Sequence, residues 1–150
     1  MQLTSTNFRN GRIPQTFTCD GADTSPQLAW TAPPATTKGL ALLLTDPDAP
    51  SGTFTHWVLY NLPAATQALA EGLPKQAQLP DGSRQGSNDF GRLGYGGPCP
   101  PRGSTHRYVF TLYALDAALP LPPGATRAQV EEAMRGHILT MGQLTARYAR

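Results

Sequence analysis

The chain has 150 residues, with 12 lysines and arginines against 10 acidic residues, and these charges are spread along the sequence. The length indicates one domain over residues 1–150 that can bury a core of its own. A nucleic-acid-binding protein normally carries a basic stripe or arm, and because none is visible we expect no nucleic-acid partner.

Two cysteines, Cys19 and Cys99, lie far apart in the sequence, and the first residues lack the charged and apolar regions of an export signal. No run of residues approaches the roughly 18 apolar positions of a membrane span. The sequence therefore predicts a cytoplasmic protein without a membrane span, in which both cysteines are reduced.

The predicted elements are mostly short strands bounded by turn formers. A hairpin turn at Asn10-Gly11 joins two short N-terminal strands, and the stretch PQLAW before Thr31 predicts another strand. The clearest strands are rich in β-branched and aromatic residues and cover residues 39–45, 54–62 and 106–115. Together with 15 glycines and 15 prolines, this pattern predicts an antiparallel β-sandwich with Greek-key features.

Helical signals are confined to the C-terminal end. Thr126 and Gln129 have the spacing of a capping box, and apolar residues from Val130 to Tyr148 recur at roughly helical spacing. Gly136 interrupts this pattern. The sequence therefore predicts a pair of helices from about Arg127 to Tyr148 that closes the sandwich.

The strand pattern singles out a few polar side chains. Side chains two apart in a strand face the same side, so His106 and Tyr108 are predicted to project together. His56 falls on an apolar strand face near a strand end. Asp46 and Asp48 follow the strand 39–45 in a turn that two prolines restrict, so their carboxylates lose little entropy on being held.

Two longer motifs carry more specific information. The stretch DPDAP, followed by HW, and the stretch GGPCPPRG, followed by HRYVFTLYALD, resemble the phosphatidylethanolamine-binding protein family, in its bacterial Raf-kinase-inhibitor-like branch. The resemblance runs from end to end and includes TCDGADTSPQLAW, QGSNDFGRLGYGGPCPP and AMRGHIL. It implies a β-sandwich with a small anion-binding cavity at one end, and a protein without an established catalytic reaction or cofactor.

The resemblance also implies which residues line that cavity and what it holds. Expected ligands are phosphate, acetate or a phosphorylethanolamine head group, and eukaryotic relatives suggest a kinase or protease as a protein partner. This chain departs from relatives at Phe54, where many carry Trp, and at Cys99, where eukaryotic relatives often carry Gly. The lining residues carried over from the two motifs are Asp46, Pro50, Phe54, His56, Cys99, Pro101, His106 and Tyr108.

The chemistry of these residues agrees with an anion pocket. Two imidazoles and a phenol supply N–H and O–H donors, and loop amides can add more. The carboxylate of Asp46 fits such a site if it orients a histidine, or if it accepts a proton from a phosphate monoester or an ammonium group on the ligand.

Other readings of the same residues remain open. His56, His106 and Asp46 form a plausible metal-ligand set, although no ligand spacing such as HxH or HExxH supports it. A hydrolase would use Cys99 as its nucleophile and His106 as the base. Low charge leaves apolar surface to cover, and bacterial relatives look dimeric by resemblance, so we also expect a homodimer.

Overall fold

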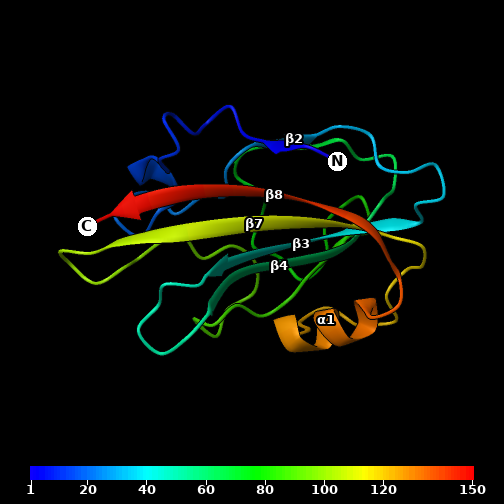
Figure 1. Ribbon diagram of the computed structural model, residues 1–150. Helices are drawn as coiled ribbons and strands as arrows, with labels where there is room; N and C mark the ends of the chain where they lie inside the picture. The colour runs from blue at the N-terminus through cyan, green and yellow to red at the C-terminus, as the bar shows by residue number, and fades with distance from the viewer.

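A computed structural model describes all 150 residues as a mainly β protein with two antiparallel sheets (Figure 1). The prediction of a mainly β protein with antiparallel strands is confirmed, and the sandwich arrangement and the Greek-key connections stay predictions. Helical structure is limited to a 3₁₀ turn at Gln15–Phe17 and the helix α1 at Arg127–Met134. The smaller sheet has the order β1 (Leu3–Thr4), β2 (Leu28–Trp30), β5 (Ala68–Leu69), and the larger has the order β6 (Arg84–Gln85), β4 (Phe54–Leu62), β3 (Gly39–Asp46), β7 (Thr105–Leu115), β8 (Ile138–Ala149).

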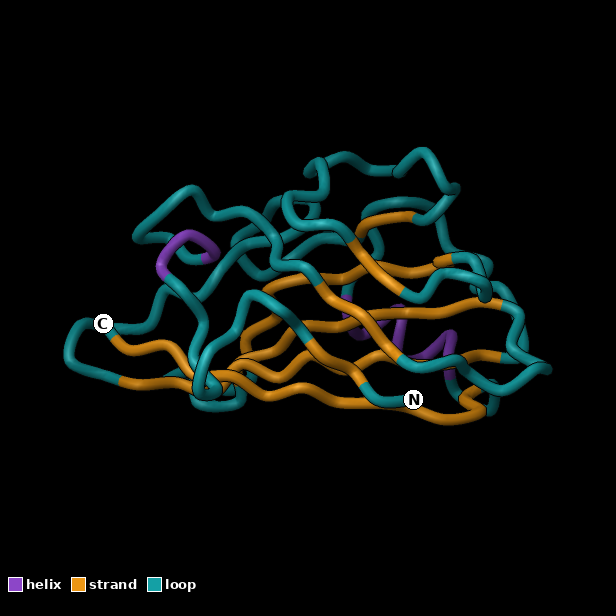
Figure 2. The backbone as a smooth tube through the Cα atoms, turned by 90° about the horizontal axis from the view of Figure 1, so that it is seen from above, coloured by secondary structure: helices purple, strands orange, loops and turns teal.

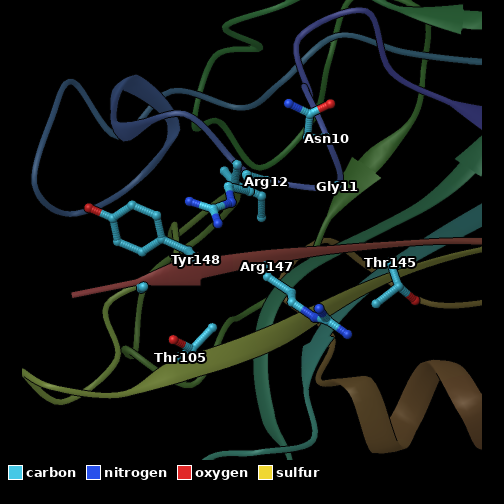
Figure 3. A pocket seen from close by; sticks show the side chains of 9 residues that line it. Asn10, Gly11, Arg12, Thr105, Thr145, Arg147 and Tyr148 are labelled. Carbon is cyan, nitrogen blue, oxygen red and sulfur yellow. The ribbon is translucent and has the colours of Figure 1, made fainter.

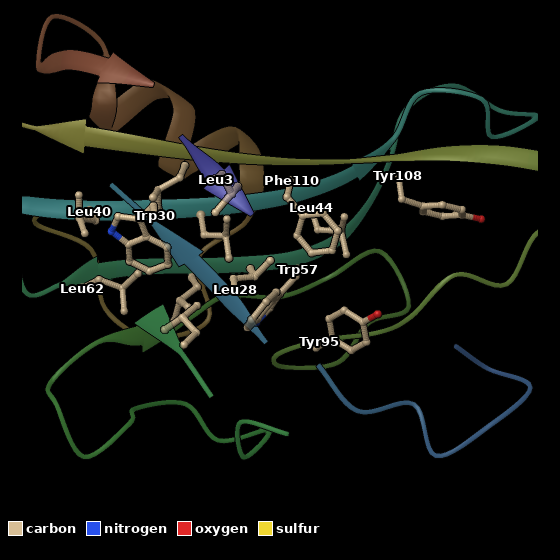
Figure 4. Packing of buried hydrophobic residues seen from close by; sticks show 14 of the residues in the cluster. Leu3, Leu28, Trp30, Leu40, Leu44, Trp57, Leu62, Tyr95, Tyr108 and Phe110 are labelled. Carbon is tan, nitrogen blue, oxygen red and sulfur yellow. The ribbon is translucent and has the colours of Figure 1, made fainter. Parts of the chain in front are cut away.

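Strand β3 shows why the larger sheet forms where it does. Its run of apolar residues is buried on both faces, as expected for a central strand. Leu40, Leu42 and Leu44 join the main cluster, which also contains side chains of the smaller sheet, while Ala41 and Leu43 join a second cluster beneath helix α1. Figure 4 shows side chains of both sheets meeting in the main cluster, among them the labelled Leu44, Trp57 and Trp30.

The predicted C-terminal helical pair is half wrong. Helix α1 begins at the predicted capping box, in which Thr126 Oγ1 accepts from the Gln129 amide and the Gln129 side chain accepts from the Thr126 amide. After Gly136, which has φ +80°, the chain forms strand β8 instead of a second helix. Strand β8 pairs with β7 over almost its whole length, so tertiary pairing outweighs the helical spacing of its apolar residues.

The prediction of reduced cysteines is also wrong. Cys19 and Cys99, 80 residues apart, form a disulfide, and no free cysteine remains. The two cysteines meet because the loops at residues 15–23 and 96–101 lie side by side, where the Cys19 amide also donates to the Pro98 carbonyl at 3.1 Å. Nothing in the sequence indicates that these two loops are neighbours. A disulfide-bonded Cys99 cannot act as a thiolate nucleophile, which removes the thiol-hydrolase reading in this state.

Antiparallel pairing collects several strand ends at one end of the larger sheet. There β3 and β8 end, while β4 and β7 begin, and the C-terminus lies at the same end (Figure 1). Figure 2 shows loops gathered around the sheets, and Figure 1 shows helix α1 on the opposite side of the larger sheet from β2. Neither the helix nor the 3₁₀ turn has the length and apolar character needed to cross a membrane.

Candidate functional site

A cavity of about 310 Å³ lies at the end of the sheet where these strand ends meet. Seven of the eight predicted site residues line it, and the eighth, Tyr108, is buried behind the lining residues. The lining residues are Asp46, Ala49, Pro50, Phe54, His56, Phe90, Cys99, Pro100, Pro101, His106 and Arg150.

A buried histidine–carboxylate pair forms the polar part of this cavity. His106 Nδ1 lies 2.6 Å from Asp46 Oδ2, and both side chains are almost fully buried. The other carboxylate oxygen, Oδ1, accepts from the Asp48 amide at 2.8 Å. Because a carboxylate can only accept, Nδ1 of His106 carries a proton, and Nε2 is the ring nitrogen left for a ligand. Asp46 thus orients His106.

His56 is held in the same way by a backbone oxygen. Its Nδ1 lies 2.7 Å from the Gly96 carbonyl, so Nδ1 donates and Nε2 remains available. Burial lowers the pKa of His56 below its ordinary value, although the Gly96 carbonyl and the Asp46 charge act in the opposite direction. His56 is therefore a neutral ring at neutral pH, and its Nε2 is then an acceptor.

Tyr108 supports the histidines from the core. Its ring is fully buried and lies edge-on to His56 at a centroid distance of 5.3 Å, and nearly parallel to His106 at 6.4 Å. Its hydroxyl has no hydrogen-bond partner. Burial, together with the Asp46 charge, raises the pKa of Tyr108, so the hydroxyl stays protonated. Tyr108 lies two residues further from the start of β7 than His106, on the same face and closer to the core, which explains why it does not line the cavity.

An aromatic wall faces the polar part. Phe54 and Phe90 meet edge-on at a centroid distance of 4.8 Å, and each also contacts the ring of His56. Phe90 is 42% exposed, which is unusual for a large apolar side chain in this protein. The cavity therefore offers apolar surface to any part of a ligand that extends beyond its charged group.

Arg150 is a lining residue that the sequence analysis missed. Its guanidinium pairs with Asp20 at 3.0 Å and lies 3.4 Å from the Pro100 carbonyl, while its Nε has no partner. The Arg150 amide bonds to the Ser104 carbonyl, which ties the last residue to the loop before β7. Arg150 lies outside both motifs used in the sequence analysis, so no sequence signal pointed to it.

Asp48 and the alternative metal-ligand set, both raised by the sequence, do not form part of the cavity's polar groups as a unit. Asp48 accepts from the Arg107 backbone amide at 2.8 Å and from its side chain at 3.0 and 2.8 Å, so it anchors the turn. These bonds lower the pKa of Asp48 well below its usual range. No group of three His, Cys, Asp or Glu side chains is placed to hold a metal ion.

Comparisons with known proteins agree on one family. The family model described as Phosphatidylethanolamine-binding protein matches residues 4–149. A UPF0098 protein of Methanothermobacter thermautotrophicus is 54% identical over 140 residues, which cover 93% of this chain and 92% of that protein. The UPF0098 protein YbhB of Escherichia coli is 40% identical over 158 residues, covering 99% of this chain and all of that protein.

Two solved structures support the same assignment. The putative phosphatidylethanolamine-binding protein homolog CT736 of Chlamydia trachomatis has a TM-score of 0.89 at 41% identity, with 99% and 97% of the two chains covered. Escherichia coli YbcL, described as a member of the mammalian PEBP family, has a TM-score of 0.91 at 32% identity, with 99% and 98% covered. The chain belongs to the phosphatidylethanolamine-binding protein family.

Proposed function

We propose that the protein is a non-enzymatic binding protein whose cavity holds a small anion, namely phosphate, a carboxylate such as acetate, or a phosphorylethanolamine-type head group. The observation that carries the proposal is the pair of oriented imidazoles. His56 and His106 each have Nδ1 engaged by a fixed acceptor, which leaves both Nε2 atoms for a ligand. Arg150, whose guanidinium is paired with Asp20, adds N–H donors to the same lining.

The protonation of the histidines decides which form of the ligand binds. A neutral imidazole presents an acceptor at Nε2, which repels a bare phosphate oxygen. A proton on the phosphate, or a proton taken up by the imidazole, converts each unfavourable contact into a charge-assisted hydrogen bond. Binding of phosphate is therefore coupled to proton uptake and weakens as pH rises.

The role of Asp46 follows from its two contacts. Both of its oxygens already have partners within the chain, at 2.6 and 2.8 Å. It serves as the orienting group for His106, and an ammonium group on the ligand is not needed to explain it. The aromatic wall at Phe54 and Phe90 accommodates the organic part of a phosphate monoester.

Calorimetry with phosphorylethanolamine and acetate tests the proposal. We expect saturable binding by the wild type that becomes weaker from pH 6 to pH 8, with an apparent enthalpy that depends on the ionisation enthalpy of the buffer because a proton is taken up. His106→Ala should lose most of the affinity. The matched control is His137→Ala, because His137 pairs with Asp116 at 2.8 Å in an exposed position outside the cavity.

The same samples separate the alternatives. A product assay and a metal analysis accompany each titration. Turnover that disappears in His106→Ala, or stoichiometric zinc or iron in the wild type, would favour the hydrolase reading. Equal binding by His106→Ala and His137→Ala would remove the cavity from consideration as the anion site.

The proposal also covers the oligomeric state, a protein partner and the cellular location. We expect a homodimer, and light scattering that gives one 16.0 kDa species at tens of micromolar contradicts it. Modulation of a kinase or protease rests on the family resemblance alone. Cytoplasmic location also stays a prediction, and the Cys19–Cys99 disulfide weighs against it because disulfides persist mainly in oxidising compartments.

A further inference from the structure

Three arginines occupy neighbouring positions across the edge of the larger sheet. In the pairing of β7 with β8, Arg107 lies directly opposite Arg147. On the other side of β8, Arg12 is the bridge partner of Arg147, and the Ile13 amide donates to the Arg147 carbonyl at 2.8 Å. Paired residues on adjacent strands face the same side of a sheet, so the three side chains leave from one face.

Only one of these arginines has a counter-charge. Arg107 forms a two-pronged ion pair with Asp48. Arg12 and Arg147 are exposed and take part in none of the ion pairs that the chain forms. Like charges at directly paired positions destabilise a sheet. Asp48 offsets the charge of Arg107 only, so the repulsion between Arg12 and Arg147 is not relieved by an ion pair within the chain.

A second cavity, of about 650 Å³, lies over these two arginines and shares no lining residue with the first cavity. Figure 3 shows Arg12 and Arg147 on neighbouring segments, with Thr145 on β8 and Thr105 on β7 adding hydroxyl groups. Its lining contains no acidic residue: it consists of Asn10, Gly11, Arg12, Ile13, Thr105, Thr145, Arg147, Tyr148 and Ala149.

We propose that this second cavity binds a ligand with two linked phosphate groups, of the diphosphate class. Each guanidinium can bind phosphate oxygens through two parallel N–H groups, so two uncompensated arginines match two phosphate groups. The threonine hydroxyls can donate to the remaining oxygens. The cavity is larger than the first one, which leaves room for a group attached to the diphosphate.

Titrations in the His106→Ala background test this site separately, because that change removes the anion site proposed above. The probes are inorganic pyrophosphate and glycerol 3-phosphate, which represents a single phosphate on a lipid-type head group. We expect pyrophosphate to bind at one site, and Arg147→Gln or Arg12→Gln to weaken it by about tenfold or more. Arg92→Gln, an exposed arginine outside both cavities, is the matched control and should change the affinity less than about twofold.

The opposite results are equally clear. No pyrophosphate binding in this background, or equal losses in Arg147→Gln and Arg92→Gln, would overturn the second site. Glycerol 3-phosphate binding as tightly as pyrophosphate would overturn the assignment to linked phosphates and favour a single head-group phosphate.

Thermal unfolding gives a second measurement on the same variants. Because Arg147→Gln removes a like-charge pair, its melting temperature without ligand should equal or exceed that of the wild type. Pyrophosphate should raise the melting temperature of the wild type and leave that of Arg147→Gln almost unchanged. If Arg147→Gln melts at a lower temperature than the wild type without ligand, the proposed repulsion is contradicted. The ligand response is then measured on Arg12→Gln, whose melting temperature pyrophosphate should leave almost unchanged.

Discussion

The chain has three histidines, and the contact at Nδ1 distinguishes their surroundings. His106 and His137 each face an aspartate, at 2.6 and 2.8 Å, but the first pair is buried at the cavity and the second is about half exposed. His56 faces a carbonyl and has no ion-pair partner. Two of the three histidines are therefore oriented groups at the cavity, and the third contacts an aspartate at the surface; burial distinguishes them.

Asp46→Ala should weaken anion binding by about 1–3 kcal/mol, the usual cost when a buried polar partner is removed. His106 loses the acceptor that fixes Nδ1, so its Nε2 is no longer held toward the ligand. Calorimetry with acetate at pH 6 measures the change. Asp116→Ala removes the equivalent partner of His137 and serves as the control; a loss of similar size there would show that the effect is not local to the cavity.

Burial of His56 predicts a pH dependence of stability. Its pKa is lower in the folded protein than in the unfolded chain, whose value is about 6.5, so the unfolded chain binds the proton first as pH falls. The stabilising contribution is complete above about pH 6.5 and is lost as pH falls from there toward the folded pKa. Urea unfolding at pH 7.5 and pH 5 should show a smaller loss for His56→Gln than for the wild type; equal losses would contradict a neutral buried His56.

At the scale of elements, the sequence predicted best where side-chain burial alone decides the structure. The bounds of β4 match residues 54–62, and β3 and β7 differ from the predicted ranges by one residue at one end. Strand β8 was missed because its partner lies more than 20 residues away, and sequence spacing does not report such pairing. Its exposed Ile138 and Met141 contributed to the apparent helical spacing without facing a core.

The loop that carries Cys99 depends on a close backbone approach at Gly97. A Cβ atom there would lie 2.3 Å from the Phe17 carbonyl oxygen and 2.5 Å from an Asp23 carboxylate oxygen, which accepts from the Gly97 amide. Gly97→Ala should therefore lower the free energy of unfolding by about 1–3 kcal/mol. Gly39→Ala is the matched control, because its nearest contact is 3.6 Å from the added carbon. Urea unfolding that gives equal stabilities for both variants would contradict this account.

At the scale of the whole molecule, the candidate site is a product of topology. Its polar residues come from β3, β4, β7 and Arg150. The turn between β3 and β4 and the loops at residues 89–91 and 98–101 complete the lining. The two motifs predicted which residues gather there only through the family resemblance. Strand alternation by itself assigns a side chain to one face of its strand, and it does not show which strands are adjacent. Neither the motifs nor strand alternation predicted the place of Arg150 in the cavity or the disulfide, because each depends on the three-dimensional approach of distant segments.

The Cys19–Cys99 disulfide joins the N-terminal loop to the wall of the cavity across 80 residues. Closing a loop of that length restricts the unfolded chain, so its removal should lower the free energy of unfolding by about 2–4 kcal/mol. The Cys19→Ala/Cys99→Ala double variant tests this in urea, and it should unfold at the same urea concentration with and without dithiothreitol. The wild type should lose stability when the reductant is present.

Anion binding should respond to the same bond. Cys99 lines the cavity next to Pro100 and Pro101, and Arg150 contacts both Cys99 Sγ and the Pro100 carbonyl. A loop released from Cys19 holds these groups less firmly, so the double variant should bind acetate more weakly than the wild type because ordering the loop then costs part of the binding energy. Thiol titration of the denatured, unreduced wild type should find no reactive cysteine. Two reactive thiols per chain, with unchanged acetate affinity in the double variant, would show that the bond is absent in solution and that the cavity wall stands without it.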